Sequence, residues 1–307
     1  MPKPKKFHGI VPAFITPFDR RGNVDVEGAK RLVRYQLKNG VHGIFALSST
    51  GELASLTAEQ REALTKAVVA EVRGRATVYV GASATCMKET LANVQQAAEW
   101  GGDAVVVIPP YFLNYSQAEL VEYYRTVARE SPIPVLAYNI PGRAKVSLDV
   151  PTLQRMHEEG SIVGLKDTTV DMARMMALCY AFRDERSFST FQGSELLVGP
   201  SFLFGCDGAV AALANVAPKQ FVQVYNAALK KDVDEVYRLQ REINGIFQLF
   251  FGCGDIGATV NNFLLSVKVA LKLLGLCDTP MAQLSREPKK EEVKKVRAIL
   301  VKHGLLG

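Results

Sequence analysis

The chain has 307 residues, of which 48% are hydrophobic and 22% charged. This composition is typical of a globular protein and excludes a chain that is mainly disordered. No uninterrupted apolar stretch is long enough to cross a membrane, and the segment after the basic start MPKPKK is too short for a signal sequence. We therefore expect a cytoplasmic protein with no membrane partner.

The net charge is +6, from 37 basic and 31 acidic residues. The basic residues are spread along the chain, which is a weak signal for nucleic acid. The densest cluster, Lys289 to Arg297, includes glutamates and has apolar residues at helical spacing. This pattern predicts a terminal amphipathic helix with a solvated face, so we expect no nucleic-acid partner.

The five cysteines are widely scattered and form no CxxC pair. An odd, scattered set argues against a disulfide framework or a zinc module. The four histidines lack metal-ligand spacing. We therefore expect free thiols and no metal site.

Short apolar segments alternate with longer amphipathic ones along most of the chain. The short segments are bounded by Gly, Pro or polar residues, and many are rich in Val and Ile, which is typical of buried strands. The predicted strands are Gly9 to Phe14, Gly43 to Leu47, Thr77 to Gly81, Ala104 to Ile108, Val135 to Tyr138, Val163 to Lys166, Phe188 to Gln192 and Gly208 to Ala212. The predicted helices between them are Val26 to Lys38, Thr57 to Val72, Lys88 to Trp100, Ser116 to Glu130, Asp149 to His157 and Met172 to Phe182.

This alternation predicts an α/β fold with a parallel sheet, and eight strand–helix units are the number that closes a (β/α)8 TIM barrel. We expect residues 1–225 to form the barrel and residues 226–307 to form a C-terminal helical extension packed on it. The extension contains an apolar cluster around Phe247 to Phe251 and an apolar helix, Leu264 to Leu276. These apolar segments are expected to cover one side of the barrel or to form an oligomer face. The alternative, an open doubly wound sheet, is disfavoured because no GxGxxG follows the first strand.

Lys166 is the most informative candidate residue, because it ends a predicted apolar strand. Catalytic residues of such barrels lie at the carboxyl ends of the strands. Burial disfavours the charged form of an amine, which makes the free amine available to attack a ketone or aldehyde and form a Schiff base. The alternative is a structural lysine paired with Asp167 or another carboxylate.

Three other positions at the same end of the barrel suit this chemistry. Tyr138 ends the neighbouring strand, and its phenol could shuttle protons; otherwise it is a packed aromatic. The turn from Ser49 to Glu52 offers hydroxyls and backbone N–H groups to a carboxylate, unless it is a plain connecting turn. Arg143 could bind a second carboxylate with two hydrogen bonds, or lie on the surface.

STGE at 49–52, YNIPGR at 138–143 and GLKD at 164–167 together resemble the dihydrodipicolinate synthase / N-acetylneuraminate lyase family. The resemblance runs from GIVPAFITPF near the start to VKVALKLLGL near the end. Members are class I aldolases that bind pyruvate as a Schiff base, need no metal or organic cofactor, and are commonly homodimers or homotetramers. The resemblance implies that Lys166 carries the imine, Tyr138 transfers protons, Ser49 and Thr50 hold the pyruvate carboxylate with Ser49 also in the proton relay, and Gly193 and the backbone of Val210 line the pyruvate pocket.

Arg143 makes the chain most similar to dihydrodipicolinate synthase, an enzyme of lysine biosynthesis whose corresponding arginine holds the carboxylate of aspartate semialdehyde. Phe112 departs from that pattern. The synthase usually has a tyrosine at this position, which reaches across the dimer interface and joins the proton relay of the partner subunit. Either Tyr111 or Tyr115 substitutes for it, or the relay is shorter. The alternatives are a 2-keto-3-deoxy sugar-acid aldolase or related keto-acid aldolase or dehydratase, a catalytically silent keto-acid-binding paralogue, and a structural barrel without a ligand.

Overall fold

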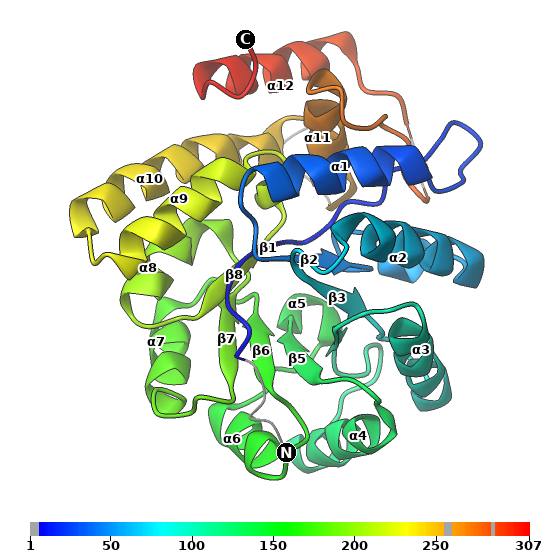
Figure 1. Ribbon diagram of the computed structural model, residues 1–307, viewed down its shortest axis with the longest axis vertical. Helices are drawn as coiled ribbons and strands as arrows, with labels where there is room; N and C mark the ends of the chain where they lie inside the picture. Colours follow the sequence, from blue (N-terminus) through cyan, green and yellow to red (C-terminus); the bar gives the residue numbers. More distant parts are fainter. Residues whose placement is uncertain (1–5, 255–259, 284–285) are drawn as a thin grey trace.

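The eight apolar segments form one parallel β-barrel in the computed structural model, which describes residues 6–254, 260–283 and 286–307 (Figure 1). The strands are β1 (Gly9–Pro12), β2 (Gly43–Ala46), β3 (Thr77–Gly81), β4 (Ala104–Val107), β5 (Val135–Asn139), β6 (Gly164–Asp167), β7 (Ser189–Gln192) and β8 (Gly208–Ala211). Their order is β1-β8-β7-β6-β5-β4-β3-β2, and a bridge between Ala13 and Phe45 joins the two ends. The TIM barrel predicted from the sequence is confirmed, and each strand lies within two residues of its predicted bounds.

The barrel helices surround the strands and follow them in sequence. They are α1 (Val26–Lys38), α2 (Ala58–Val72), α3 (Met87–Glu99), α4 (Gln117–Glu130), α6 (Val150–Glu158), α7 (Met172–Ala181), α8 (Val198–Leu203) and α9 (Pro218–Leu229), with a short extra helix α5 (Pro141–Ala144). All helices predicted from the sequence before residue 190 lie within one residue of their expected ends. Helix α8 was not predicted, because its sequence VGPSFL is too short to show a helical period and contains Gly and Pro.

Capping side chains explain where two of these helices begin. Thr57 and Gln60 form a reciprocal capping box at α2, and Ser116 and Glu119 form another at α4. Each box satisfies backbone N–H groups that a helix start leaves without an intrahelical partner. The two boxes thereby fix where the segments after β2 and β4 turn into helix.

Two apolar layers hold the barrel. The larger lies between the strands and the helices. The smaller fills the barrel interior and includes Val11, Phe45, Tyr79, Phe191 and Val210. The interior is therefore packed with side chains and does not form a pore.

The remaining helices are α10 (Val233–Ile246), α11 (Val260–Leu273) and α12 (Lys290–Lys302). Helix α10 packs against α8 and α9, whereas α11 contacts α12 and the 3-10 turn Phe247–Phe251. In Figure 1, α11 and α12 lie beside one another at the end of the molecule that carries the C-terminus. The domain boundary expected after residue 225 lies inside α9, the last helix of the barrel.

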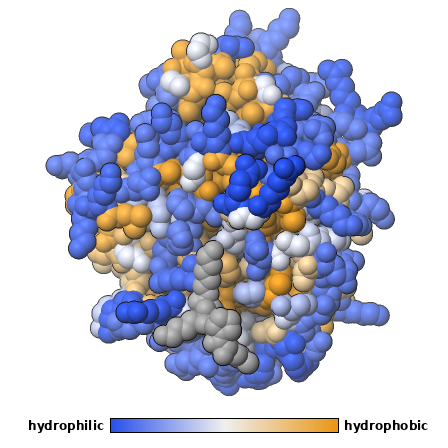
Figure 2. Space-filling view, viewed as in Figure 1, coloured by the Kyte–Doolittle hydropathy of each residue, from blue (hydrophilic) through white to orange (hydrophobic). Residues whose placement is uncertain are grey.

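The face seen in Figure 2 is mostly hydrophilic, with apolar surface where the C-terminal helices lie. Across the described ranges, no helix is both long and apolar enough to span a membrane. The same ranges hold no group of three His, Cys, Asp or Glu side chains placed to bind a metal ion. Cys86 is exposed and the other four cysteines are buried, all as free thiols.

Candidate active site

Lys166 and Tyr138 lie side by side at the carboxyl ends of β6 and β5. They are register partners on adjacent parallel strands, and both side chains point into the barrel mouth. The Lys166 Nζ lies 4.2 Å from the centroid of the Tyr138 ring and 5.3 Å from that of Phe45. Lys166 is only 4% exposed and Tyr138 only 2%. The amine is therefore held against aromatic faces, out of bulk water.

Asp167 does not neutralise this lysine. Its buried carboxylate accepts hydrogen bonds from the Asn139 amide (2.8 Å), from Thr169 and from Arg174 Nε (2.8 Å). Among the described residues, no carboxylate lies within ion-pair distance of Lys166 Nζ. The alternative of a lysine salt-bridged to Asp167 is therefore wrong, and Asp167 instead ties β5 and β6 to α7.

The Tyr138 phenol has an altered acidity. Burial would raise its pKa, but the positive charge of Lys166 and the nearby hydroxyls of Ser49 and Thr168 outweigh burial and lower the pKa below its usual value. A phenol of lowered pKa gives up its proton more readily than an ordinary tyrosine. Tyr138 is therefore suited to proton transfer beside the amine.

Ser49 reaches Tyr138 from the turn that follows β2. The distance between its Oγ and the Tyr138 hydroxyl is 3.2 Å. The turn is closed by a hydrogen bond from the Gly51 N–H to Ser48 Oγ (3.0 Å), and Thr16 Oγ1 donates to the Gly51 carbonyl (2.6 Å). A Cβ on Gly51 would lie 2.7 Å from a backbone oxygen, so the close packing of the turn requires glycine.

One cavity of about 160 Å³, called the inner cavity below, is lined by all the site residues expected from the sequence. Ser49, Thr50, Tyr138, Arg143, Lys166, Gly193 and Val210 all line it. A Cβ on Gly193 would lie 2.5 Å from Thr168 Oγ1 and 2.8 Å from the Asp167 carbonyl oxygen, so a side chain there would force its surroundings to shift. The size of the cavity suits a small keto acid.

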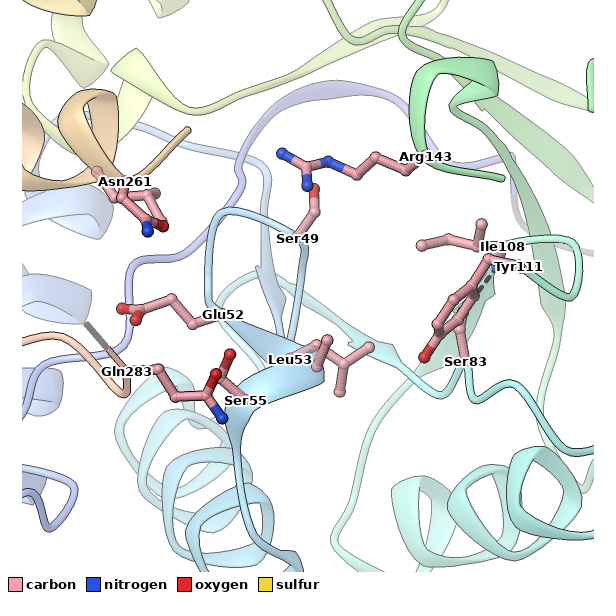
Figure 3. Close-up of a pocket in the computed structure, with 12 residues that line it drawn as sticks. Ser49, Glu52, Leu53, Ser55, Ser83, Ile108, Tyr111, Arg143, Asn261 and Gln283 are labelled. Atoms are coloured by element: carbon pink, nitrogen blue, oxygen red, sulfur yellow. Dashed lines mark hydrogen bonds between the residues drawn. The ribbon is translucent and has the colours of Figure 1, made fainter. Parts of the chain in front are cut away.

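A second cavity of about 310 Å³ adjoins the first and shares Ser49, Arg143 and Leu264 with it. Arg143 projects from α5, and Figure 3 shows its guanidinium pointing toward Ser49. Ser55, Ser83, Asn261 and Gln283 add hydroxyl and amide groups to this outer cavity. The first cavity thus continues past Arg143 into a larger, partly polar space.

The structure separates the two tyrosines considered as substitutes at Phe112. Phe112 itself is 87% exposed and has a φ of 100°, outside the usual range for a side-chain-bearing residue. Tyr111 lines the outer cavity, where burial raises its pKa. Tyr115 lines a different hollow with Met87. Of the two, only Tyr111 faces the candidate site.

Sequence reasoning gave no role to Glu195, although it lines the inner cavity and is 5% exposed. Its Oε1 accepts hydrogen bonds from the backbone N–H groups of Ala212 (2.8 Å) and Leu213 (3.2 Å). Burial raises the pKa of Glu195 and outweighs these hydrogen bonds. Its position two residues after Gly193, at a strand end, was the available signal.

The C-terminal extension closes one wall of the inner cavity. Phe250, Phe263 and Leu264 line it, and the rings of Phe250 and Phe263 stack with centroids 3.7 Å apart. This explains the apolar cluster around Phe247 to Phe251, for which the sequence left two interpretations open. At Phe250 the cluster covers the barrel mouth.

Comparisons with known proteins agree with this geometry. The model of the dihydrodipicolinate synthetase family matches residues 6–303. The 4-hydroxy-tetrahydrodipicolinate synthase of Methanoculleus marisnigri is 30% identical over 300 residues, which cover 97% of this chain and 100% of that protein.

Two solved structures show the same fold over nearly the whole chain. The dihydrodipicolinate synthase of Bacteroides thetaiotaomicron has a TM-score of 0.90 and 34% identity, covering 96% of this chain and 98% of that one. A prophage protein of the dihydrodipicolinic acid synthase family from E. coli K12, solved with pyruvate, has a TM-score of 0.90 and 28% identity, covering 97% and 99%. The chain therefore belongs to the dihydrodipicolinate synthetase family and is a lyase of the class I aldolase type.

Proposed function

We propose that this enzyme makes or breaks a carbon–carbon bond of pyruvate through an imine on Lys166. One arrangement carries the proposal: the Lys166 amine lies 4.2 Å from the Tyr138 ring, and the Tyr138 hydroxyl lies 3.2 Å from Ser49 Oγ. Nucleophile, proton carrier and carboxylate-binding turn thus open into one small cavity. The family member solved with pyruvate supports a keto acid as the first substrate.

The chemistry follows from these positions. In its neutral form, the amine of Lys166 attacks the keto carbon of pyruvate, and loss of water leaves a protonated imine. Tyr138, relayed by Ser49, delivers the proton that the departing hydroxyl needs. The protonated imine then takes up the electron pair left when the pyruvate methyl group loses a proton to the Tyr138 phenolate, which gives a neutral enamine. The enamine attacks an aldehyde carbon, the aldehyde oxygen takes a proton, and water releases the product from Lys166.

Dihydrodipicolinate synthase activity, which joins pyruvate to aspartate semialdehyde for lysine biosynthesis, is the assignment we favour. Arg143 supports it, because a guanidinium at the border of the two cavities can bind the carboxylate of that aldehyde with two hydrogen bonds. In the part of the chain that the structure describes, no carboxylate pairs with Arg143. The names of the relatives in the comparison support the same activity.

A 2-keto-3-deoxy sugar-acid aldolase, or a related keto-acid aldolase or dehydratase, is the second candidate. The outer cavity favours it, because Ser55, Ser83 and Asn261 offer hydroxyl and amide partners for the hydroxyls of a longer substrate. A direct comparison decides between the two. The purified protein would be assayed for condensation of pyruvate with aspartate semialdehyde and for cleavage or dehydration of 2-keto-3-deoxy sugar acids. A kcat/KM at least tenfold higher for the semialdehyde supports the synthase, and the reverse ratio supports the second candidate.

A catalytically silent paralogue would bind pyruvate reversibly and form no imine. The burial of Lys166 beside the Tyr138 phenol, with no carboxylate paired to it among the described residues, counts against this alternative. Reduction with borohydride in the presence of pyruvate separates the two, since only an imine is fixed by it.

We further propose a cytoplasmic homodimer or homotetramer. The exposed side chains of Phe112 and Leu113, 87% and 60% accessible beside the barrel mouth, support contact with another subunit. The free thiols support a reducing compartment. Light scattering coupled to size exclusion tests the assembly, and a monomer at micromolar concentration would contradict it.

A further inference from the structure

The turn that carries Ser49 is bounded by two residues in an unusual backbone conformation. Leu47 has a φ of 55° and Glu52 a φ of 63°, both in the left-handed region. Neither is a glycine, so each conformation is strained. Strained residues persist only where the surrounding structure holds them, and they concentrate at functional sites. Contacts from outside the turn must therefore hold it in this shape.

Glu52 makes such contacts with the C-terminal extension. Its Oε1 lies 2.6 Å from Lys268 Nζ, and its Oε2 accepts a hydrogen bond from the Ala282 N–H at 2.8 Å. The Lys268 ammonium also donates to the Pro280 carbonyl at 2.6 Å. The Glu52 side chain is 7% exposed and that of Lys268 0%. Both carboxylate oxygens thus join the turn after β2 to α11 and the segment that follows it.

Burying the charges of Glu52 and Lys268 costs the solvation free energy that both groups have in water. Burial lowers the pKa of Lys268, and the charge of Glu52 opposes this effect. Replacing a buried ion pair by apolar side chains is often neutral or stabilising, so stability alone is a weak reason for this pair. Its distinctive property is geometric, because two buried charges with further hydrogen bonds permit one arrangement of the turn against α11.

The same helix lines the candidate site. Leu264, one helical turn before Lys268, lines both the inner and the outer cavity. Ser49 lies three residues before Glu52 in the turn, and Figure 3 shows Glu52 directed to the side where Asn261 and Gln283 lie. The pair thus connects the cavity wall on α11 with the turn that presents Ser49 to Tyr138.

We propose that Glu52 and Lys268 form a positioning pair, which acts on the reaction by fixing Ser49 against Tyr138. Glu52 also lines the outer cavity, but Lys268 and the Ala282 N–H occupy its two carboxylate oxygens, so in this account the pair acts through the position of Ser49. The inference rests on the proposed function only for its catalytic consequence. The placement of Ser49 against Tyr138 is a property of the free enzyme and can be measured without substrate.

The test compares Lys268→Met, the double variant Glu52→Gln/Lys268→Met and the matched control Lys272→Met. Lys272 lies on the same helix and pairs with Asp278 at the surface, where the two side chains are 48% and 34% exposed. The double variant removes both buried charges, so it produces no net change in charge and avoids an unpaired buried carboxylate. It is the variant that keeps the test informative if Lys268→Met does not fold.

The first readout is the titration of Tyr138, followed by NMR of tyrosine labelled with ¹³C at Cζ and assigned with Tyr138→Phe. In the folded double variant the Tyr138 pKa rises as far as it does in Ser49→Ala, and adding Ser49→Ala raises it no further. Lys272→Met titrates like the wild type. A folded double variant with the wild-type Tyr138 pKa would overturn the proposal.

The second readout is the rate at which pyruvate becomes trapped by borohydride. The double variant loses rate by roughly 10- to 100-fold, as expected when a catalytic group moves by about 1 Å, while its unfolding temperature stays near that of the wild type. Recovery of both rate and unfolding temperature in the double variant would show a purely structural pair and overturn the proposal. If the wild type traps no pyruvate, the proposed function fails, and the Tyr138 titration alone decides the inference.

Discussion

The Lys166 amine lies 4.2 Å from the centre of the Tyr138 ring because the two residues are register partners at the ends of β5 and β6. Partners on adjacent parallel strands point to the same face of the sheet. Tyr138 belongs to the layer that fills the barrel interior, so both side chains meet in the cavity at the mouth. The proximity of amine and phenol is thus fixed by backbone pairing, and flexible loops play little part in it.

Replacing Tyr138 by Phe removes the phenolic hydroxyl and leaves the ring in place. We expect the rate of pyruvate trapping and kcat to fall on the order of 10²- to 10⁴-fold, the usual contribution of a positioned proton-transfer group. Tyr35→Phe is the control, because the Tyr35 hydroxyl binds the Val216 carbonyl (2.8 Å), outside the site. A Tyr138→Phe enzyme with wild-type rates would contradict the assigned role.

Arg143→Ala should act on the second substrate. Loss of a charge-assisted pair of hydrogen bonds predicts a KM about 10- to 100-fold higher for a carboxylated aldehyde. Borohydride trapping of pyruvate should change little, because the keto-acid site lies around Lys166. Steady-state kinetics with aspartate semialdehyde measure this, and an unchanged KM would remove Arg143 from aldehyde binding.

The sequence predicted the barrel well, because its strands are short, buried and separated by helices with clear periodicity. It also predicted the group of residues around Lys166, since the ends of parallel strands meet at one edge. Glu195 was missed because a single acid after a strand gives no periodic signal. The pair of Glu52 and Lys268 was missed because its partners are 216 positions apart, and only the packing of α11 on the barrel brings them together.

Tyr111→Phe tests which tyrosine extends the proton relay. Tyr111 lines the outer cavity with Ser49, whereas Tyr115 lines a separate hollow. We expect Tyr111→Phe to lower kcat at least severalfold, below the full effect of a direct proton donor, and Tyr115→Phe to leave it unchanged. Rate measurements on both variants check this, and a loss confined to Tyr115→Phe would reverse the assignment.

Gly193→Ala tests the close packing of the inner cavity. The new Cβ would lie 2.5 Å from Thr168 Oγ1. Overpacking of this kind typically costs about 1–3 kcal/mol of folding free energy, and the narrowed cavity should raise the KM for pyruvate. Gly142→Ala is the control for stability, since nothing lies within 4 Å of a Cβ there. Chemical denaturation and pyruvate kinetics measure both effects, and unchanged values for Gly193→Ala would contradict the packing argument.

Glu292 predicts an acid-sensitive contact in the C-terminal extension. Arg286 donates a hydrogen bond to each carboxylate oxygen of Glu292. These hydrogen bonds are the main reason why the pKa of Glu292 is lowered from 4.5 to about 2. The folded state therefore binds the proton less well than the unfolded state. The stabilisation is fully present above pH 4.5 and is lost as the pH falls toward about 2.

The Glu292→Gln variant checks this assignment. At neutral pH it should be less stable by about 2 kcal/mol, the usual worth of hydrogen bonds to a charged group. Its unfolding temperature should also depend less on pH between 4.5 and about 2 than that of the wild type. Equal pH dependence of the two proteins would show that Glu292 does not carry the effect.

The central claim is that Lys166 forms an imine with pyruvate, and one measurement addresses it directly. The folded protein would be incubated with pyruvate, reduced with borohydride, and digested for peptide mass spectrometry. We predict one stable pyruvate-derived adduct, located on Lys166 and absent from Lys166→Met. A folded wild-type protein that stays unmodified, or that carries the adduct on another lysine, would contradict the account.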